Sequence, residues 1–321
     1  MEQTSNVRER RTMQSIVFGP AAAALCALAT IASAQELPTS KPTQKPKIEP
    51  PSHISPDWKT PGTGGVVTGD KLVKARGTAD VDAIVPGQKF LLAFVFQIEP
   101  GWHIYWQNSG ASGAATEISV SGPTGFVIGK TLFPRPRAFT EPEGTVYGYE
   151  GETVLFVEVT APMEPGPTGS AMFRAELDWL VCKDVCKMGN ASQVITLPVS
   201  ASMARPEPKK DAVVERFKSR LPRILTHGQD GAVAELKDGM LHLEIPAQGR
   251  TTAEFFPIEV PGLKYGTAEI KVESDRVLMK VPVEVNARNA GGKPIVVKGL
   301  AALGQSLDDP CFEFEFPLPA P

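Results

Sequence analysis

This chain of 321 residues has few cysteines and no excess of positive charge, and each of these features argues against a class of protein. The chain has four cysteines, too few for a small fold held together mainly by disulfides. Lysine and arginine total 33 against 36 aspartates and glutamates, so the formal net charge is −3. This mild acidity gives no support for nucleic-acid binding, which needs a basic patch.

Long apolar runs are also scarce, and the one that is present lies near the N-terminus. The basic "RERR" (Arg8–Arg11) precedes an apolar run from Ile16 to Ile31, which ends at the small residues Ala32–Ala34. This order predicts a cleaved signal peptide over residues 1–34, with a retained membrane anchor as the alternative. We therefore expect a mature chain without a transmembrane segment, located in the periplasm, where disulfides persist.

Turn-forming residues are plentiful, with 29 glycines and 30 prolines that divide the chain into short segments. Between them, "TEISVSG", "TVLFVEVTAP" and "AMFRAELDWLV" alternate apolar and polar residues, which is typical of half-buried strands. The fold class that we predict is all-β. It consists of two immunoglobulin-like β-sandwich domains in tandem, with a short helix at the start of the second.

Proline-rich stretches mark the domain boundaries. After the signal peptide we predict a disordered linker (35–65), a first sandwich (66–201), a second linker (202–211) and a second sandwich (212–321). The segment "DAVVERFKSRL" has one apolar face and predicts the short helix, with Asp211 as its N-cap.

Two cysteines stand close together in "DWLVCKDVCKMGN" (Asp178–Asn190). A disulfide needs Cα atoms about 4.4–6.8 Å apart, whereas four residues of extended strand span about 13 Å. Cys182 and Cys186 can therefore pair only if the residues between them form a turn. The strand-like "AELDWLV" leads into this turn, so we expect the pair at a strand end.

Three roles stay open for this pair on spacing alone: redox exchange, a structural disulfide, and metal binding. Lys183 and Lys187 favour a thiolate, whereas Asp184 opposes it. A disulfide across so short a loop stabilises a fold only weakly, which argues against a purely structural role. Together with Met188, the cysteines offer soft ligands that suit Cu(I), but a closed zinc site needs further cysteines or histidines.

The remaining candidates for metal or thiol chemistry are scattered. We expect the four histidines to be surface or edge residues rather than ligands; they are His53, His103, His227 and His242. Cys311 is followed by Phe312 and Phe314, which favours a buried, inert thiol over a link between two chains.

The cysteine motif "WLVCKDVCKMG" resembles that of the N-terminal, periplasmic domain of the DsbD-type thiol:disulfide interchange proteins, in particular the ScsB-like branch. Four further segments resemble motifs of that family: "GWHIYWQNSGASG", "YGYEGETVLFVEV", "FFPIEV" and "VKGLAAL". The resemblance implies an immunoglobulin-like fold in which Cys182 and Cys186 exchange electrons, without another cofactor. It implies a membrane-embedded thiol protein as electron donor, and thioredoxin-fold or other oxidised periplasmic proteins as acceptors.

The family's transmembrane segments and its C-terminal thioredoxin-like domain are not found before the chain ends at Pro321. We therefore expect a protein-disulfide oxidoreductase component, a disulfide reductase or electron-transfer adapter, that a separate membrane protein reduces. Cytochrome c biogenesis and copper tolerance are the processes expected for it. Two alternatives stay open: a copper-binding or copper-stress protein that uses Cys182, Cys186 and Met188, and a non-catalytic binding module with a structural disulfide.

Residues around the cysteines are expected to support the exchange. These supporting candidates are Trp179, Lys183, Asp184, Tyr147 and Tyr149. In this family a loop can cap the cysteines, and residues 134–149 ("PRPRAFTEPEGTVYGY") are the candidate for it. The aromatic cluster of "GWHIYW" (Trp102, Tyr105 and Trp106) is expected to be sandwich core rather than a binding surface.

Overall fold

A computed structural model of the protein describes residues 68–164, 169–200, 211–225, 231–286 and 296–317, all within one compact unit, Thr63–Pro321. In the described residues nearly every element is a strand, and the two helices are short, which confirms the all-β prediction. The predicted signal peptide and proline-rich linker lie outside the described residues, as does the second linker except for Asp211. The division into domains 66–201 and 212–321 stays a prediction.

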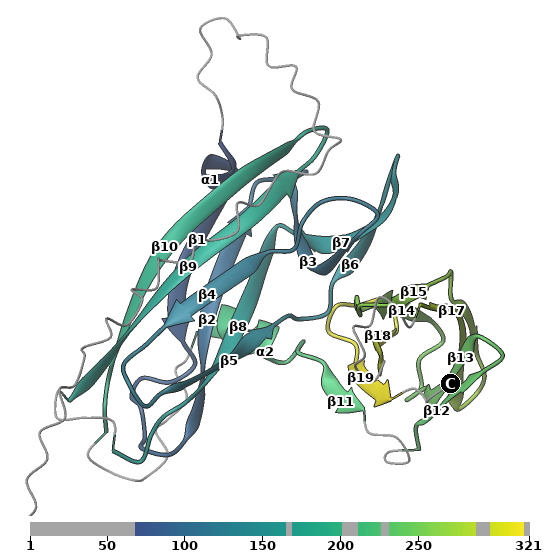
Figure 1. The fold of residues 1–321 in the computed structure, drawn as a ribbon. Coiled ribbons are helices and arrows are strands. Elements are labelled where there is room, and N and C mark those ends of the chain that lie inside the picture. Colours follow the sequence, from purple (N-terminus) through teal and green to yellow (C-terminus); the bar gives the residue numbers. More distant parts are fainter. Residues whose placement is uncertain (1–67, 165–168, 201–210, 226–230, 287–295, 318–321) are drawn as a thin grey trace, which may run out of the picture. The chain divides into compact units, whose positions relative to one another are not determined.

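Residues 73–198 build two sheets, which we call the N-terminal sheets (Figure 1). One sheet has the strand order β1-β2-β8-β5, and the other has the order β10-β9-β3-β7-β6 with β4 paired to β9. The strands are β1 (Val73–Ala79), β2 (Lys89–Ile98), β3 (His103–Gly110), β4 (Glu117–Ser121), β5 (Val127–Leu132), β6 (Arg137–Glu141), β7 (Gly144–Glu150), β8 (Glu152–Thr160), β9 (Ser170–Cys182) and β10 (Cys186–Pro198), preceded by helix α1 (Gly69–Leu72).

The two N-terminal sheets pack face to face through a core of large apolar side chains. Strand β9 buries every second residue along most of its length, as the alternation in its sequence predicted. Trp179 of β9 meets Phe96 of β2 edge to face, with ring centroids 5.7 Å apart, and Phe173 meets Phe90 in the same way at 5.8 Å. These contacts join the sheets into a sandwich, which is the architecture predicted for this part of the chain.

The second face of strand β2 is covered by helix α2 (Ala212–Lys218), so "LLAFVF" is buried on both sides. The side chain of Asp211 accepts hydrogen bonds from the backbone amides of Val213 and Val214, which confirms the predicted N-cap. Val214 and Phe217 then pack against the outward residues of β2 and β8. A strand buried on both faces needs a continuous apolar run, and this is why β2 does not alternate.

Residues 223–317 build two further sheets, which we call the C-terminal sheets. One has the order β11-β19-β18-β14, and the other has the order β12-β13-β17-β15 with β16 paired to β17. The strands are β11 (Arg223–Leu225), β12 (Val233–Lys237), β13 (Met240–Pro246), β14 (Ala253–Pro257), β15 (Leu263–Tyr265), β16 (Glu269–Val272), β17 (Arg276–Val285), β18 (Val296–Leu303) and β19 (Cys311–Pro317). A shared core of alternate residues from β13, β17, β18 and β19 lies between these sheets.

Candidate functional site

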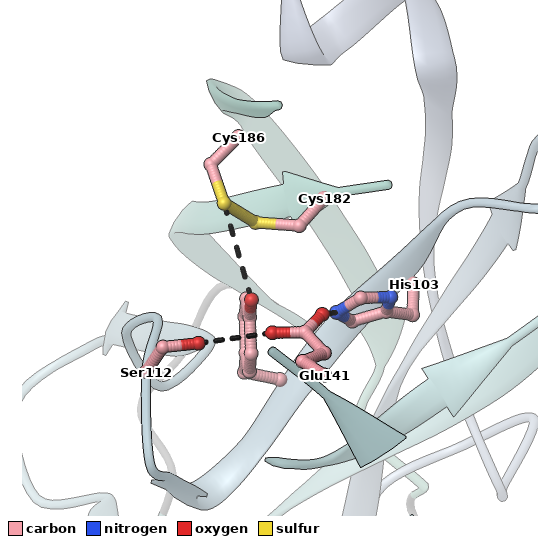
Figure 2. Close-up of a disulfide and its surroundings, with 6 residues drawn as sticks. His103, Ser112, Glu141, Cys182 and Cys186 are labelled. Carbon is pink, nitrogen blue, oxygen red and sulfur yellow. Dashed lines mark hydrogen bonds and ion pairs between the residues drawn. A yellow bond between two sulfur atoms is a disulfide. The ribbon is translucent and has the colours of Figure 1, made fainter. Parts of the chain in front are cut away.

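The predicted cysteine pair forms a disulfide at the tip of the hairpin made by β9 and β10 (Figure 2). Cys182 ends β9, Cys186 begins β10, and the two residues face each other in the antiparallel register. Their Cα atoms lie 4.1 Å apart because residues 183–185 form the predicted turn. The hairpin thus brings together two sulfurs that a straight strand would hold apart.

The two halves of the disulfide differ in their exposure to solvent. Cys182 is 1% exposed, whereas Cys186 is exposed together with the three turn residues before it. Cys182 belongs to a small apolar cluster, whose other members are Tyr105, Val146, Phe139 and Leu180. An incoming thiol therefore meets Cys186 first, and Cys182 lies behind it.

Tyr105 of β3 lies beneath the disulfide. Its hydroxyl oxygen is 4.0 Å from the Sγ atom of Cys186, and burial raises the pKa of Tyr105 to about 12. At neutral pH the hydroxyl therefore keeps its proton and can donate it in a hydrogen bond to sulfur. Gly113, at φ +87°, packs on the ring of Tyr105 so closely that a Cβ atom there would collide with the ring.

A carboxylate and an imidazole stand next to Tyr105. The Oε1 atom of Glu141 lies 3.3 Å from Nε2 of His103, and its Oε2 atom accepts a hydrogen bond from Ser112 (Figure 2). The His103 ring stacks on Phe139 at 5.0 Å and meets Tyr105 edge to face at 5.1 Å. Burial lowers the pKa of His103 below 6.5, although nearby glutamates oppose this shift, so the imidazole is neutral at neutral pH.

The site occupies one face of a sheet whose other face belongs to the core. Successive side chains of a strand point to opposite faces. On β3, His103 and Tyr105 face the site, whereas Ile104 and Trp106 are part of the sandwich core. On β9, Leu180 and Cys182 face the site, whereas Trp179 and Val181 are part of the sandwich core.

This alternation corrects three of the supporting residues expected from the sequence. Trp179 is buried against Phe96 in the core and does not cover a sulfur. Tyr147 packs edge to face on Trp106, and Tyr149 donates a hydrogen bond to the Pro134 carbonyl oxygen at 2.8 Å. Val146 on β7 and Cys182 on β9 face the site. The three aromatic side chains lie an odd number of residues from these positions on the same strands, so they point to the core face of the sheet.

Lys183 and Asp184, the other expected supporting residues, are exposed in the turn of the hairpin itself. Met188, proposed as a soft ligand, is 81% exposed two residues after Cys186. Within the described part of the chain, no group of three or more His, Cys, Asp or Glu side chains is arranged to hold a metal ion. Cys311 is a free thiol that is 4% exposed, as expected, and burial raises its pKa to about 11.

Several residues of the site were not identified from the sequence. His103 is buried rather than on the surface, and its partner Glu141 lies 38 residues along the chain, on β6. Phe139 and Glu141 come from the segment that the family resemblance suggested as a cap, and they share one face of β6. A pairing of β6 with β7, and of β7 with β3, is needed before these residues can be placed at the disulfide.

The sequence of this sandwich matches a known family. Residues 69–198 match the family described as "Thiol:disulfide interchange protein DsbD, N-terminal". This segment is a DsbD-type N-terminal domain. The match covers every strand of the N-terminal sheets and includes both cysteines of the hairpin.

The fold also has a solved counterpart. The N-terminal periplasmic domain of ScsB from Proteus mirabilis matches with a TM-score of 0.54 and 17% identity, over 80% of this chain and 97% of that chain. A protein of unknown function from Porphyromonas gingivalis W83 matches with a TM-score of 0.23 and 12% identity, over 77% and 100% of the two chains. No curated protein matches the chain in sequence.

The family match and the likeness to the ScsB domain confirm the expected DsbD/ScsB-type N-terminal domain and its immunoglobulin-like fold. The ScsB structure matches beyond the DsbD-type domain, since its counterpart here covers 80% of the chain. Among the described residues, no helix is long and apolar enough to cross a membrane.

Proposed function

We propose that this protein carries out thiol:disulfide interchange in the periplasm through the Cys182–Cys186 disulfide. The observation that carries the proposal is the asymmetric disulfide at the hairpin tip of a DsbD-type domain, with one exposed and one buried sulfur. The periplasmic location is supported by the likeness to a domain described as periplasmic and by the predicted signal peptide.

The exchange proceeds in two balanced steps. A donor thiolate attacks Cys186 Sγ, the Cys182–Cys186 bond breaks, and Cys182 leaves as a thiolate that takes up a proton. A second donor thiol attacks the mixed disulfide, so the donor is oxidised to a disulfide and both cysteines become thiols. In the reverse sense, the Cys186 thiolate attacks the disulfide of an oxidised partner, and Cys182 resolves the mixed disulfide.

Side chains around the pair suit these steps. The Tyr105 hydroxyl, 4.0 Å from Cys186 Sγ, stays protonated at neutral pH and is placed to stabilise a thiolate there. The apolar cluster around Cys182 keeps water and adventitious oxidants from the resolving sulfur. The disulfide itself carries the electrons, and the exchange as proposed needs no other cofactor.

The partners follow from the same chemistry. The donor is a membrane-embedded thiol protein, and the acceptors are thioredoxin-fold or other oxidised periplasmic proteins. Both present a sulfur to the exposed Cys186, so the surface that they share is the hairpin tip with Lys183, Asp184 and Val185. The protein then acts as a disulfide reductase or an electron-transfer adapter.

The reduction potential of the pair tests this function. Equilibration of the mature protein with graded glutathione buffers should give a value between about −270 and −120 mV, the range of exchange-active pairs. A value below about −300 mV, where structural disulfides lie, would contradict the proposal. Cys311→Ser serves as the control. Cys311 is a free, buried thiol on β19, so its replacement should leave the reduction potential of the pair unchanged.

Trapping gives the order of attack. Cys182→Ser keeps the exposed thiol and removes the resolving one, so it should accumulate mixed disulfides with periplasmic partners in cells. Cys186→Ser keeps only the buried thiol and should accumulate far less. Equal trapping by both variants would contradict the assignment of Cys186 as the attacked and attacking residue.

Copper binding is a second candidate, and one observation favours it. Cys186 and Met188 are both exposed and lie two residues apart on β10, which places their sulfur atoms on one side of the strand. Once the disulfide is reduced, these side chains and Cys182 offer soft ligands for Cu(I). Anaerobic titration of the reduced protein should then show a stoichiometric site that Met188→Leu weakens, and a titration without such a site would remove this candidate.

A further inference from the structure

The β6–β7 hairpin, residues 137–150, carries two of the residues that cover the buried half of the disulfide. We call it the cap hairpin. Phe139 of β6 and Val146 of β7 contact the apolar cluster that contains Cys182. With the cap hairpin in place, Cys182 is 1% exposed and Cys186 is exposed.

The chain enters the cap hairpin through Arg135, a buried arginine. Its side chain is 2% exposed, although arginine is almost never fully buried unless it is paired. It lies four residues before Phe139, a distance of about 13 Å in an extended strand. The buried segment Pro134–Pro136 is therefore the base of the cap hairpin, remote from the disulfide itself.

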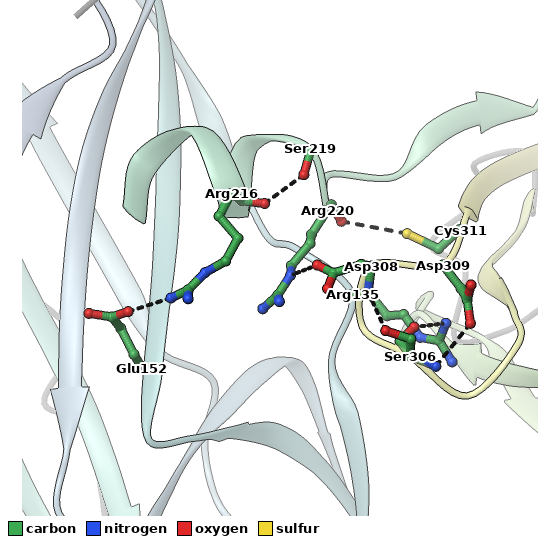
Figure 3. A network of polar contacts seen from close by, with 9 residues as sticks. All are labelled: Arg135, Glu152, Arg216, Ser219, Arg220, Ser306, Asp308, Asp309 and Cys311. Carbon is green, nitrogen blue, oxygen red and sulfur yellow. Dashed lines mark hydrogen bonds and ion pairs between the residues drawn. The ribbon is translucent and has the colours of Figure 1, made fainter. Parts of the chain in front are cut away.

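The guanidinium of Arg135 donates hydrogen bonds to β14 and to the end of β18 with the loop that follows it, and Figure 3 shows the bond to Ser306 of this loop. Nη1 donates to the carbonyl oxygens of Leu303 at 2.7 Å and Ser306 at 2.8 Å. Nη2 donates to the carbonyl oxygen of Gly304 at 2.9 Å and to the Glu254 carboxylate at 3.0 Å. Such a planar fork with several acceptors fixes both the position and the orientation of the side chain.

The loop that accepts these bonds is itself held in place. Asp309 accepts hydrogen bonds from the Ser306 amide at 2.9 Å and from Arg250 Nε at 2.7 Å. Gly304 adopts φ +66°, a conformation that turns the backbone where its carbonyl meets Arg135. The acceptor loop is thus a preformed socket rather than a surface that adapts to the arginine.

Further contacts fix the cap hairpin from the same side. Phe256 of β14 is 1% exposed, and its ring meets that of Tyr147 on β7 at 5.4 Å. Tyr149 of β7 donates to the carbonyl oxygen of Pro134, next to the arginine. Both strands of the cap hairpin are therefore tied at their base, one by Arg135 and the other by two tyrosines.

We propose that Arg135 is a positioning residue for disulfide exchange: by anchoring the cap hairpin in the 303–306 socket, it keeps Cys182 buried and directs incoming thiols to Cys186. The C-terminal sheets thereby act on the disulfide through the cap hairpin. This inference rests on the proposed function, since it concerns the selectivity of that exchange.

The test is the site of attack by reduced glutathione on the oxidised protein. Glutathione thiolate adds to one cysteine, the protein disulfide breaks, and the other cysteine is released as a thiolate that N-ethylmaleimide caps at early times. Trypsin then separates the two products, because Lys183 lies between the cysteines: Cys182 ends up in residues 175–183 and Cys186 in residues 184–187. Mass spectrometry of these peptides gives the ratio of attack at the two sulfurs.

The wild-type protein should carry glutathione almost entirely on Cys186. Arg135→Gln should raise the ratio of Cys182 to Cys186 adducts about tenfold, since losing one hydrogen bond to a charged group shifts an equilibrium by that order. Arg137→Gln is the matched control. It removes an arginine of the same hairpin whose side chain is 52% exposed and paired only at the surface with Glu150, so the ratio should not change.

The outcomes separate the inference from the function on which it rests. If glutathione opens the wild-type disulfide at Cys186 and folded Arg135→Gln gives the same ratio, the inference is overturned and the proposed function stands. If glutathione opens the disulfide in neither protein, the proposed function fails. Should Arg135→Gln not fold, Glu254→Ala takes its place, because it removes the counter-charge of Arg135 at a 51% exposed position; an unchanged ratio there overturns the inference.

Discussion

Reduction of the Cys182–Cys186 disulfide should weaken the fold only slightly. The bond closes a loop with a sequence separation of only four residues. Chain-entropy arguments give about 2 kcal/mol for so short a loop, compared with about 4.7 kcal/mol for a loop of 100 residues. Strands β9 and β10 meanwhile stay paired over their whole length, from Cys186 opposite Cys182 to Pro198 opposite Ser170.

The expected loss corresponds to a fall in melting temperature of about 4–8 °C, since 1 kcal/mol shifts Tm by about 2–4 °C in a protein of 150–250 residues. Calorimetry of the oxidised protein, the protein in a phosphine reductant, and Cys182→Ser/Cys186→Ser measures it. Cys311→Ser with and without reductant controls for the third thiol. A loss of cooperative unfolding on reduction, or a fall of more than about 20 °C, would refute the reasoning, because an exchange protein must be folded in both redox states.

Three further predictions concern Cys311 and two residues near the disulfide. Cys311, with its pKa raised to about 11 by burial, should resist iodoacetamide at pH 8 in the folded protein and react once urea unfolds it. Burial holds the pKa of His103 below its unfolded value of 6.5. The stability that this residue contributes is therefore present above pH 6.5 and is lost as the pH falls. His103→Gln should flatten the decline in the free energy of unfolding measured between pH 7 and pH 5. Gly113→Ala should cost about 2 kcal/mol or more in urea unfolding, because φ +87° and the adjacent Tyr105 ring both oppose a Cβ atom.

Local features of the sequence were sufficient to predict several elements of this fold. The alternation in β9 marks a strand with one buried face, and the distance argument requires a turn between the cysteines. Asp211 before an amphipathic stretch predicts where helix α2 begins. Each of these predictions depends on neighbours within about ten residues, which is the range over which periodicity and capping act.

The site could not be assembled in the same way, because its residues come from separate strands. His103, Glu141 and Cys182 are brought together by the pairing of β3 with β7 and β9 and of β7 with β6. The sequence signal of each residue is slight: one histidine, one glutamate before a proline. A family resemblance supplied the cap segment, but only the sheet register shows which of its side chains face the disulfide.

The alternation of side chains along a strand explains why the strands could be predicted and why the residues that face the disulfide could not. Tyr147 and Tyr149 are aromatic and lie in a segment that resembles a family motif, yet both point into the core, whereas Val146, between Thr145 and Tyr147, faces Cys182. A shift of one residue exchanges the two faces of a strand, so a prediction that locates a strand within one or two residues cannot say which side chains reach the site. Arg135 lies further still beyond such reasoning, since its acceptors are 119 to 171 residues away. The burial of Arg135 between two prolines can be explained only when the carbonyl oxygens that it binds are known. These oxygens belong to residues 303–306, so the hydrogen bonds join the base of the cap hairpin to the C-terminal part of the chain.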